Sequence, residues 1–393
     1  MFTTRLRTLL RPLMAAVPLL LASPLHANDA SWQQTLLAAR GQTVYFNAWG
    51  GSPEINAYLV WARQEIARQY QVELVQVKVD DIAQSVSQLL AGKQAGKQAG
   101  KTSNGPIDLL WVNGENFKAL KEQGLLGAPF TDELPNMALV DTALPVSEDF
   151  TVPVEGLEAP WGIGQLNLMV DGDQVDAPPT SAAALLAWAK AHPGRFTYPK
   201  PPQFHGSSFL KQILLELTPD PAPLYQEATD ADFLRITAPL WAWLDQLHPA
   251  LWRKGRLFPT GGAETRQLLD DGELAMAISF NPGEAQSSVQ NGTLPPTVQA
   301  IAMEKGALTN SHFLAIPFNA SARAGAKVVV NFLLSPAAQA RKSDPTFWGD
   351  PSVLRQEALP GQTRPALRFK GVAEPHPSWQ TRLEAAWAER YGH

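Results

Sequence analysis

The sequence predicts an α/β protein built from two similar units, and three observations lead to this prediction. Short apolar strands alternate with amphipathic helices from residue 43 to residue 123, which is the pattern of a parallel sheet covered by helices. The same alternation begins again near residue 166. Two more short strands and a helix follow residue 298, so we expect the chain to return to the first unit after it has built the second.

The first unit contains three predicted strands, each followed by a helix. A β-rich run predicts the first strand, and the next helix has Ser52 as its cap and Pro53 in its first turn. Strict alternation of apolar and polar residues predicts the second strand. A short apolar run predicts the third, and Gly124 ends the helix after it. In order, the strands and helices are expected at 43–48, 53–69, 72–79, 81–90, 107–112 and 116–123.

The second unit repeats this organisation with longer helices. Ser181 caps one predicted helix, and Pro239 interrupts another. Strands are expected at 166–170, 195–198 and 274–280, and helices at 181–191, 207–217, 231–247 and 265–270. The returning part is expected to contain strands at 299–303 and 313–316 and a helix at 322–334, before a tail that is Pro-rich in the middle and helical near its end.

The N-terminus has the three parts of a Sec-type secretory signal peptide. Arg5, Arg7 and Arg11 form a basic region, an apolar stretch covers 13–21, and Ala27 ends a cleavage region. The apolar stretch is shorter than the roughly 20 residues of a spanning helix. A lipid anchor requires a cysteine, and the chain has none. We therefore expect residues 1–27 to be removed and the mature protein to be exported, and not a lipoprotein.

Length, charge and cysteine count exclude several classes of function. The 393 residues suit about two domains, and residues 28–393 carry 29 basic against 37 acidic side chains, a net charge of −8. This acidic body argues against a nucleic-acid partner, which needs a basic surface. The absence of cysteine excludes disulfides, thiolate metal sites and Cys nucleophiles. We expect no cofactor, and the seven His are too scattered to suggest a metal site.

Two sequence motifs bear on nucleotide binding and on nucleophilic catalysis. Residues 95–102 satisfy a relaxed phosphate-loop pattern, but this tandem AGK repeat follows a helix and leads into a strand, the reverse of what phosphate binding needs. It is interpreted as a solvated helix extension. His205-Gly-Ser-Ser208 leaves open an exported hydrolase with Ser207 as nucleophile, although no oriented base is identifiable.

Polar and aromatic residues gather at four predicted strand ends, two in each unit. These segments are Asn47–Ser52, Asn113–Phe117, Tyr198–Ser208 and Ser279–Glu284. Ligands bind at the carboxyl ends of strands in parallel α/β sheets, where helix N-termini and glycines let the backbone approach. Each segment alone is explained by an ordinary turn with a helix cap. Four such segments divided between two units predict a cleft between lobes.

Several segments also resemble a known family. Val329-Val-Asn-Phe-Leu-Leu-Ser-Pro-Ala-Ala-Gln339 is similar to a C-terminal signature of periplasmic solute-binding proteins of ABC importers. More specific matches place the chain near the YnjB-type family of the type 2 periplasmic binding protein superfamily. They are Phe46-Asn-Ala-Trp-Gly-Gly51, Ile107-Asp-Leu-Leu-Trp-Val-Asn-Gly-Glu-Asn-Phe117, Asn310-Ser-His-Phe-Leu-Ala-Ile-Pro-Phe-Asn-Ala-Ser321 and Trp348-Gly-Asp350.

This resemblance implies a two-lobed, type II periplasmic-binding-protein fold, in which each lobe has a mixed, mostly parallel sheet flanked by helices. Residues 28–158 and about 300–345 would form lobe 1, residues 159–299 lobe 2, and residues 346–393 a helical tail on an unassigned lobe. Hinge strands are expected near 152–160 and 299–303. The implied function is capture of a small solute by hinge closure, followed by delivery to a membrane permease and its ATPase. We expect a monomer and no enzymatic activity.

Fourteen residues are the candidates for ligand binding, grouped by the contact each type of residue makes. Trp49, Trp161 and Tyr198 are expected to be apolar walls, and Asn47, Asn113, Asn116 and Asn281 amide donors and acceptors. Gly50, Gly51, Ser52, Ser207 and Ser208 would offer groups at helix starts, where an anion is favoured. Glu115 and Glu284 would meet a cation. The charge of the ligand is therefore left open, although we favour an organic cation, such as a thiamine-like or polyamine-like compound, or a neutral solute, over a small oxyanion.

Overall fold

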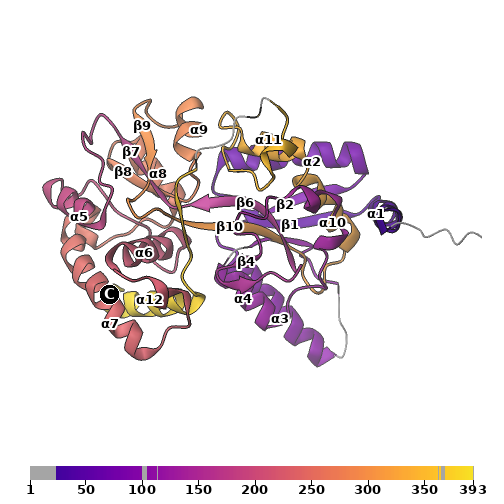
Figure 1. The fold of residues 1–393 in the computed structure, drawn as a ribbon, viewed down its shortest axis with the longest axis horizontal. Coiled ribbons are helices and arrows are strands. Elements are labelled where there is room, and N and C mark those ends of the chain that lie inside the picture. Colours follow the sequence, from indigo (N-terminus) through magenta and orange to yellow (C-terminus); the bar gives the residue numbers. More distant parts are fainter. Residues whose placement is uncertain (1–23, 100–103, 113, 362, 364–367, 393) are drawn as a thin grey trace, which may run out of the picture.

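The computed structural model describes residues 24–99, 104–112, 114–361, 363 and 368–392. It shows two α/β bodies joined by two long strands, β6 and β10 (Figure 1). The predicted α/β class is confirmed, and so is the return of the chain to the first body after the second. We call the body that contains β1–β3 the first lobe and the body that contains β7–β9 the second lobe.

The first lobe is built on a six-stranded mixed sheet. Its strands are β1 (Thr43–Trp49), β2 (Glu73–Val79), β3 (Leu109–Val112), β6 (Glu158–Gln165), β10 (Ala307–Ala315) and β11 (Gly371–Ala373). Their order is β11-β10-β3-β1-β2, with β6 also paired to β10. β1 runs parallel to β2 and β3, whereas β10 runs antiparallel to β3 and β6. The carboxyl ends of β1, β2 and β3 therefore meet at one edge of the sheet, which faces the other lobe.

Helices cover both faces of this sheet. The helices around one face are α1 (Pro24–Ala39), α2 (Pro53–Tyr70), α10 (Arg323–Leu333) and α11 (Pro336–Ser343), and those on the other are α3 (Ala83–Ala99) and α4 (Gly114–Glu122). Ser52 caps α2 as predicted, since its hydroxyl accepts from the Ile55 N–H at 3.3 Å. A short hairpin of β4 (Glu148–Asp149) and β5 (Val152–Pro153) follows farther along the chain.

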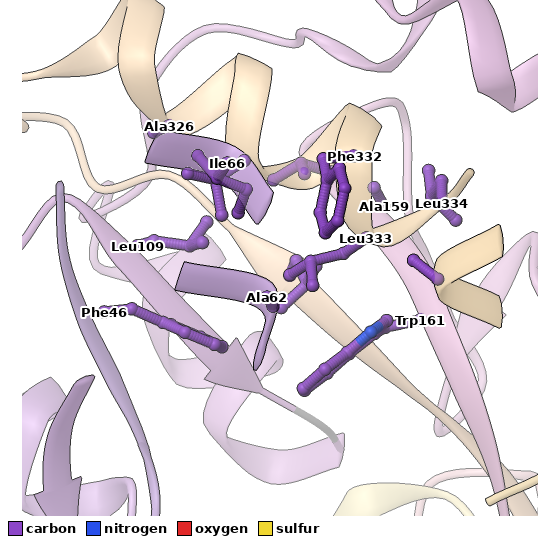
Figure 2. Packing of buried hydrophobic residues seen from close by; sticks show 14 of the residues in the cluster. Phe46, Ala62, Ile66, Leu109, Ala159, Trp161, Ala326, Phe332, Leu333 and Leu334 are labelled. Atoms are coloured by element: carbon purple, nitrogen blue, oxygen red, sulfur yellow. The ribbon is translucent and has the colours of Figure 1, made fainter. Parts of the chain in front are cut away.

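Alternating residues of the first strands form the larger core of this lobe. Phe46 and Leu109 point from the sheet toward α2 and α10, where Ala62 and Phe332 meet them, and Trp161 of β6 closes one side (Figure 2). Phe46, Leu109, Ala62 and Trp161 are completely buried. Burial of a large apolar side chain such as Phe46 or Leu109 contributes about 1.5–3 kcal/mol, so this core holds the ends of β1 and β3 in place.

The second lobe has a three-stranded sheet of β7 (Asn167–Asp171), β8 (Met276–Ser279) and β9 (Val298–Ile301). We predicted a mostly parallel sheet here, but β7 lies in the middle and runs antiparallel to both neighbours. The reason is that β7 carries the chain out of the first lobe and the chain comes back along both of its edges. Around this sheet lie α5 (Ala182–Ala191), α6 (Phe204–Leu217), α7 (Asp230–Leu247), α8 (Gly262–Asp270) and α9 (Glu284–Gln290).

One strand predicted in the second lobe is absent. Residues 195–198 have the expected burial at Phe196 and Tyr198 but belong to no sheet. Their backbone is bound to loops instead: Arg195 O accepts from Ala275 N–H and Phe196 O from Trp252 N–H, both at 2.9 Å. The apolar run was therefore a sign of burial and not of strand pairing.

The connection between the lobes lies later in the sequence than predicted at one point. The chain leaves the first sheet between β6, which ends at Gln165, and β7, which begins at Asn167, and not near residues 152–160. It returns between β9 and β10, next to the predicted segment 299–303. No apolar pattern predicts β6, because Pro160, Gly162 and Gly164 interrupt it, although every residue of the strand is buried.

The C-terminal tail is divided between the lobes. Trp348, Val353 and Leu354 belong to the core of the first lobe. The last helix, α12 (Pro377–Tyr391), packs on the second lobe, where Trp379 and Trp387 are completely buried. The described part of the AGK repeat continues α3 as a helical extension to Ala99.

The predicted signal peptide falls mostly on residues 1–23, which lie outside the described residues. The helix α1 begins at Pro24 and runs across the predicted cleavage position after Ala27. Over the ranges that the structure describes, no helix is both long enough and apolar enough to cross a membrane.

Candidate functional site

A cavity of about 170 Å³ lies between the two lobes. The first lobe contributes the ends of β1, β2 and β3, the start of α4 and the segment after α11, and the second contributes the start of α6 and the loop from β8 into α9. The lining residues are Trp49, Ile55, Asp80, Asp81, Ile82, Trp111, Glu115, Asn116, Gly164, Gln203, Phe204, His205, Phe280, Asn281, Glu284, Asn310, His312, Trp348 and Asp350. A smaller cavity adjoins it at Trp49, Ser52, Asn281 and Glu284.

Aromatic rings from both lobes form much of the cavity wall. Trp49, Trp111 and Trp348 come from the first lobe, and Phe204 and Phe280 come from the second. The Trp111 and Trp348 rings meet edge-on at 5.8 Å, and the Phe204 and Phe280 rings at 4.9 Å. Flat apolar faces of this kind suit an organic ligand, and their electron-rich surfaces attract cations.

Five carboxyl groups also line the cavity, whereas none of the described lining residues is Lys or Arg. The acids are Asp80, Asp81, Glu115, Glu284 and Asp350. They differ in whether the protein itself supplies a counter-charge, and this difference determines how much negative charge faces a ligand.

Asp350 has counter-charges within the first lobe. Lys342 Nζ bonds to Asp350 Oδ2 and also donates to the carbonyl oxygens of Asp350 at 3.2 Å and Pro351 at 2.9 Å. His312 Nε2 lies 3.1 Å from the same carboxylate oxygen. Burial alone would raise the pKa of Asp350, but His312 and Lys342 outweigh burial and hold that pKa below its usual range. Asp350 is therefore a carboxylate whose charge is compensated.

Glu284 is compensated within the second lobe. Arg266 Nη1 donates to Glu284 Oε1 at 2.8 Å, and the Ser279 hydroxyl bonds to Oε2. His205 also lines the cavity. Burial lowers the pKa of His205 below the ordinary value, although Glu284 acts in the opposite direction. A neutral imidazole and a paired carboxylate leave little net charge at this end of the cavity.

Asp80, Asp81 and Glu115 have no such partner among the described residues. Among the described residues the Asp81 carboxylate accepts only from the Ala83 backbone N–H, at 2.9 Å, where α3 begins. Glu115 stands in the first turn of α4, and its Oε2 is buried without a hydrogen-bond partner. Burial raises the pKa of Glu115 to about 7, against the opposing effect of Lys211.

Lys211 is the cation that acts on Glu115, and it is already paired with another acid. It lies on α6, is 1% exposed, and contacts Glu374 Oε2 at 2.7 Å and Gln380 Oε1 at 2.7 Å. Burial raises the pKa of Glu374 more than Lys211 and Asn310 lower it. Burial likewise raises the pKa of Glu384, which lies on α12. One ammonium thus serves several carboxyl groups where the lobes meet.

The structure brings together only some of the predicted site residues. Trp49, Glu115, Asn116, Asn281 and Glu284 line the cavity. The side-chain amide of Asn281 is bonded within the protein, since Nδ2 donates to the Trp348 carbonyl at 3.2 Å and Oδ1 accepts from Gly283 N–H at 2.9 Å. Asn113 lies outside the described residues.

Three predicted contact residues lie in the interior instead. Trp161 is completely buried behind the cavity, where its ring meets those of Trp111 at 5.0 Å and Trp348 at 5.3 Å. Tyr198 is buried in the second core, with its hydroxyl 2.7 Å from His248 Nε2. Asn47 is buried and donates to the Ser85 hydroxyl at 2.9 Å. Each is a supporting residue, because strand ends carry buried as well as exposed side chains.

The predicted backbone donors at the start of α2 also have other roles. Gly50 N–H donates to the Val79 carbonyl at 3.2 Å, which extends the pairing of β1 with β2. Gly51 lies against the Trp49 ring, where an added Cβ would come within 2.4 Å of a ring carbon. Ser52 caps α2 and borders only the smaller adjoining cavity.

The two serines at the start of α6 do not reach the cavity. Ser207 is 2% exposed and donates its hydroxyl to Glu384 Oε1 at 2.6 Å, and not to His205. Ser208 is completely buried, and its hydroxyl has no partner among the described residues. The helix begins three residues earlier than predicted, at Phe204. Ser207 and Ser208 therefore lie within the helix and not at its start, and Gln203, Phe204 and His205 line the cavity instead.

Sequence reasoning missed most of the charged and aromatic lining. Asp80 and Asp81 directly follow β2, so the strand-end argument that selected Trp49 would also have found them. Trp348 and Asp350 carried no such signal, because they lie in irregular backbone after α11. They do belong, with Trp111 and His312, to the segments on which the family resemblance rested, and those segments converge on the cavity.

Comparisons with known proteins agree on the type of molecule. The family model for bacterial extracellular solute-binding proteins matches residues 61–362. The chain is also 47% identical over 374 residues to Protein YnjB of Escherichia coli (strain K12), with 93% of this chain and 95% of that protein covered.

Solved structures with low sequence identity share the fold. The Tp0655 (TpPotD) lipoprotein of Treponema pallidum has a TM-score of 0.65 at 14% identity, covering 89% of this chain and 100% of that one. The periplasmic binding protein AfuA of Actinobacillus pleuropneumoniae has a TM-score of 0.64 at 14% identity, covering 89% and 99%. A periplasmic thiamin binding protein has a TM-score of 0.60 at 17% identity, covering 89% and 94%. These similarities confirm the two-lobed periplasmic-binding-protein fold.

Proposed function

The chain belongs to the bacterial extracellular solute-binding proteins. From that premise we propose that it serves an ABC transporter as the substrate-binding component and that its solute is a small organic cation. The cation would lie in the cavity between the lobes and be delivered to a membrane permease with its ATPase. The lobes would close over it by a hinge at the two crossings, between β6 and β7 and between β9 and β10.

The observation that carries this proposal is the composition of the cavity wall. Five aromatic rings and five carboxyl groups line it, with no Lys or Arg among the described lining residues. An oxyanion would need cationic or free N–H donors. The expected donors at Gly50, Ser207 and Ser208 are either bonded within the protein or buried. Cation–π attraction and the negative charge of the unpaired acids instead favour a cation.

The structural relatives offer a panel of candidate chemistries. The names of the related structures mention spermidine and putrescine, thiamin, and bound fructose 6-phosphate. Those ligands belong to those proteins, but they represent a polyamine, a heteroaromatic cation and a sugar phosphate. Thermal shift and titration calorimetry with spermidine, thiamin and fructose 6-phosphate therefore test the proposal directly. We expect stabilisation by a cation, and stabilisation by the phosphate alone would overturn it.

The two lobes would be the moving bodies of this closure. We propose that the first comprises residues 28 to about 165 together with about 307–359, and the second residues 167–301 together with α12. The cores support this division, because each hydrophobic cluster is confined mainly to one of these sets. Small-angle scattering with and without a stabilising cation measures it: closure should reduce the radius of gyration.

A hydrolase on the same frame remains the alternative function. It would use Ser207, whose hydroxyl donates to Glu384. A general base that accepts this proton is a feature of such sites, but Ser207 is 2% exposed. Under our proposal, one ligand is taken up per protein without product, and Ser207→Ala leaves that stoichiometry unchanged. Turnover that disappears in Ser207→Ala would favour the hydrolase.

Export as a free periplasmic monomer completes the proposal. It rests on the basic, apolar and cleavage regions within residues 1–27 and on the absence of cysteine for lipid attachment. Cell fractionation with mass spectrometry of the N-terminus tests it: the mature chain should begin near Asn28 in the periplasmic fraction, and size-exclusion chromatography should give one chain.

A further inference from the structure

The two lobes touch at a pair of glycines beside the cavity, at a place where the chain does not cross between them. Gly283 lies in the loop from β8 into α9 of the second lobe, and Gly349 follows α11 in the first. Its neighbour Trp348 is packed in the core of the first lobe and also lines the cavity. We call residues 281–283 and 347–349 the facing loops, and the helices beside them, α9 and α11, lie at the top of Figure 1.

The contact between the facing loops is backbone against backbone. A Cβ added at Gly283 would lie 2.1 Å from the Gly349 carbonyl oxygen and 2.8 Å from its carbonyl carbon, whereas ordinary van der Waals contact is 3.4–4 Å. A Cβ added at Gly349 would lie 3.0 Å from the Gly283 carbonyl oxygen. Backbone atoms cannot turn aside as the end of a long side chain can. The loops therefore approach this closely only because residue 283 has no side chain.

The need for glycine at position 283 comes from the other lobe alone. The three atoms nearest to a Cβ added there all belong to Gly349. The backbone of Gly283 has φ −92° and ψ −6°, which any L residue can adopt. Gly349, by contrast, has φ +77°, so its own conformation favours glycine. Gly283→Ala therefore changes the contact between the lobes without straining its own loop.

The bonds that accompany this contact are few and long. Asn281 Nδ2 donates to the Trp348 carbonyl at 3.2 Å, and the Ser287 hydroxyl donates to the Phe347 carbonyl at 3.4 Å. Among the described residues, no ion pair joins the two facing loops. Water can replace such hydrogen bonds when the loops separate. The contact is therefore reversible, and the fit of the two backbones determines how close the loops come.

We propose that Gly283 is a positioning residue for solute capture: because it has no side chain, the facing loops meet beside the cavity, and their contact sets how far the lobes close. A side chain at this position would hold the loops apart and leave the cavity open next to Trp348. This inference rests on the hinge closure proposed above, but it does not depend on the charge of the solute.

Two spin labels measure how far the lobes close. The chain has no cysteine, so Val60→Cys on α2 and Gln286→Cys on α9 place one label on an exposed position of each lobe. Both helices border the smaller cavity, so separation of the facing loops lengthens the distance between the labels. Double electron–electron resonance measures this distance with Gly283 and with Gly283→Ala. Each chain is measured alone and with spermidine, thiamin or fructose 6-phosphate.

We expect the chain with Gly283 to reach the label distance that this structure gives in at least one condition, and the Gly283→Ala chain to show a longer distance in all of them. Gly92→Ala, which adds a methyl group in open space on α3, is the control and should leave the distance unchanged. Circular dichroism establishes that each variant is folded.

Two outcomes would overturn the inference. In one, the Gly283→Ala chain closes to the same distance as the chain with Gly283. In the other, the labels of the chain with Gly283 stay farther apart than in this structure under every condition. Closure by fructose 6-phosphate alone, lost in Gly283→Ala, would support the role of Gly283 and overturn the cationic function.

The rate of ligand release distinguishes positioning from a general loss of structure. For the compound that closes the lobes, stopped-flow tryptophan fluorescence should show dissociation about tenfold faster in Gly283→Ala. Association should change by less than about twofold, because closure holds a ligand that has already entered. A loss confined to the association rate would contradict the inference.

Discussion

Two buried lysines, one in each lobe, show how the local balance of charge sets the behaviour of neighbouring acids. Lys342 is completely buried in the first lobe beside a single carboxylate, Asp350, with His312 as a second base. Lys211 is 1% exposed in the second lobe, and four acids surround it: Glu115, Asp149, Glu374 and Glu384.

The two surroundings shift the acids in opposite directions. The pKa of Asp350 is held below its usual range because two bases outweigh its burial. Burial raises the pKa of Glu115, Asp149, Glu374 and Glu384, and Lys211, which acts on all four in the opposite direction, does not outweigh burial. The first arrangement is a fixed ion pair, and the second is a group of acids that takes up protons. The cavity lies between them and meets both.

Removing the Lys342–Asp350 ion pair should lower stability more than any other change proposed below. Lys342→Met leaves Asp350 buried with only His312, and breaking a buried ion pair destabilises a protein by about 3–5 kcal/mol. Denaturant unfolding followed by tryptophan fluorescence measures the loss. Lys118→Met, which removes an exposed pair with Glu122, is the control and should change stability by no more than about 1 kcal/mol. Similar losses of stability in both variants would contradict the conclusion that the buried Lys342–Asp350 pair contributes more to stability than an exposed pair.

Removing Lys211 should lower stability by less, and by an amount that depends on pH. Lys211→Met should lower stability by about 2–3 kcal/mol at pH 8 and by less at pH 5, because protonated neighbours no longer need a counter-ion. Because burial raises their pKa values, these acids bind more protons in the folded protein than in the unfolded chain, between the ordinary carboxyl pKa near 4.5 and about pH 7 for Glu115. Their contribution to stability therefore falls as the pH rises through this interval. A loss independent of pH would show that the neighbours do not titrate.

Adding a methyl group beside the Asp350–Lys342 ion pair, at Gly162, should lower stability moderately. An added Cβ at Gly162 would lie 2.0 Å from Asp350 Oδ2 and 2.1 Å from His312 Nε2. Gly162→Ala must therefore displace one of these groups, with an expected loss of about 1–3 kcal/mol in thermal or denaturant unfolding. Gly92→Ala is the matched control, since it has open space within α3 and should gain about 0.5–1 kcal/mol. A neutral Gly162→Ala would show that the pair has room to move.

The smallest expected effect concerns binding. Since burial raises the pKa of Glu115 to about 7, the carboxyl group is mostly neutral at pH 6 and mostly ionised at pH 8. Affinity for benzyltrimethylammonium, whose charge does not change with pH, should therefore rise by up to about tenfold over this interval. Titration calorimetry at several pH values measures the rise, and Glu115→Gln should flatten it. An increase that persists in Glu115→Gln would assign the titration to another group.

Local sequence patterns predicted most elements of both lobes. Alternation in β2 and the cap and Pro at α2 are local features, and the structure has both elements within a residue or two. The missed strand β6 and the absent strand at 195–198 show where local patterns fail. In β6, pairing with β10 along its length overrides Pro160 and two glycines, whereas residues 195–198 are buried without a strand partner.

The site was only partly predictable for a related reason. The sequence by itself determined that polar and aromatic residues stand at strand ends of two units, and that no cysteine or basic surface is available. It therefore located Trp49, Glu115 and Glu284. Which face of a strand end or helix start reaches the cleft depends on register and rotation: α6 begins at Phe204, so Ser207 turns inward and His205 turns to the cavity.

Only the tertiary structure decided the charge balance. Asp350 and Lys342 are eight residues apart, but Arg266 and Glu284 come from different helices, and Lys211 meets Glu374 from 163 positions away. Pairing neutralises some acids of the cavity and leaves Asp80, Asp81 and Glu115 unpaired, because the field that a ligand meets depends on distances that only folding sets.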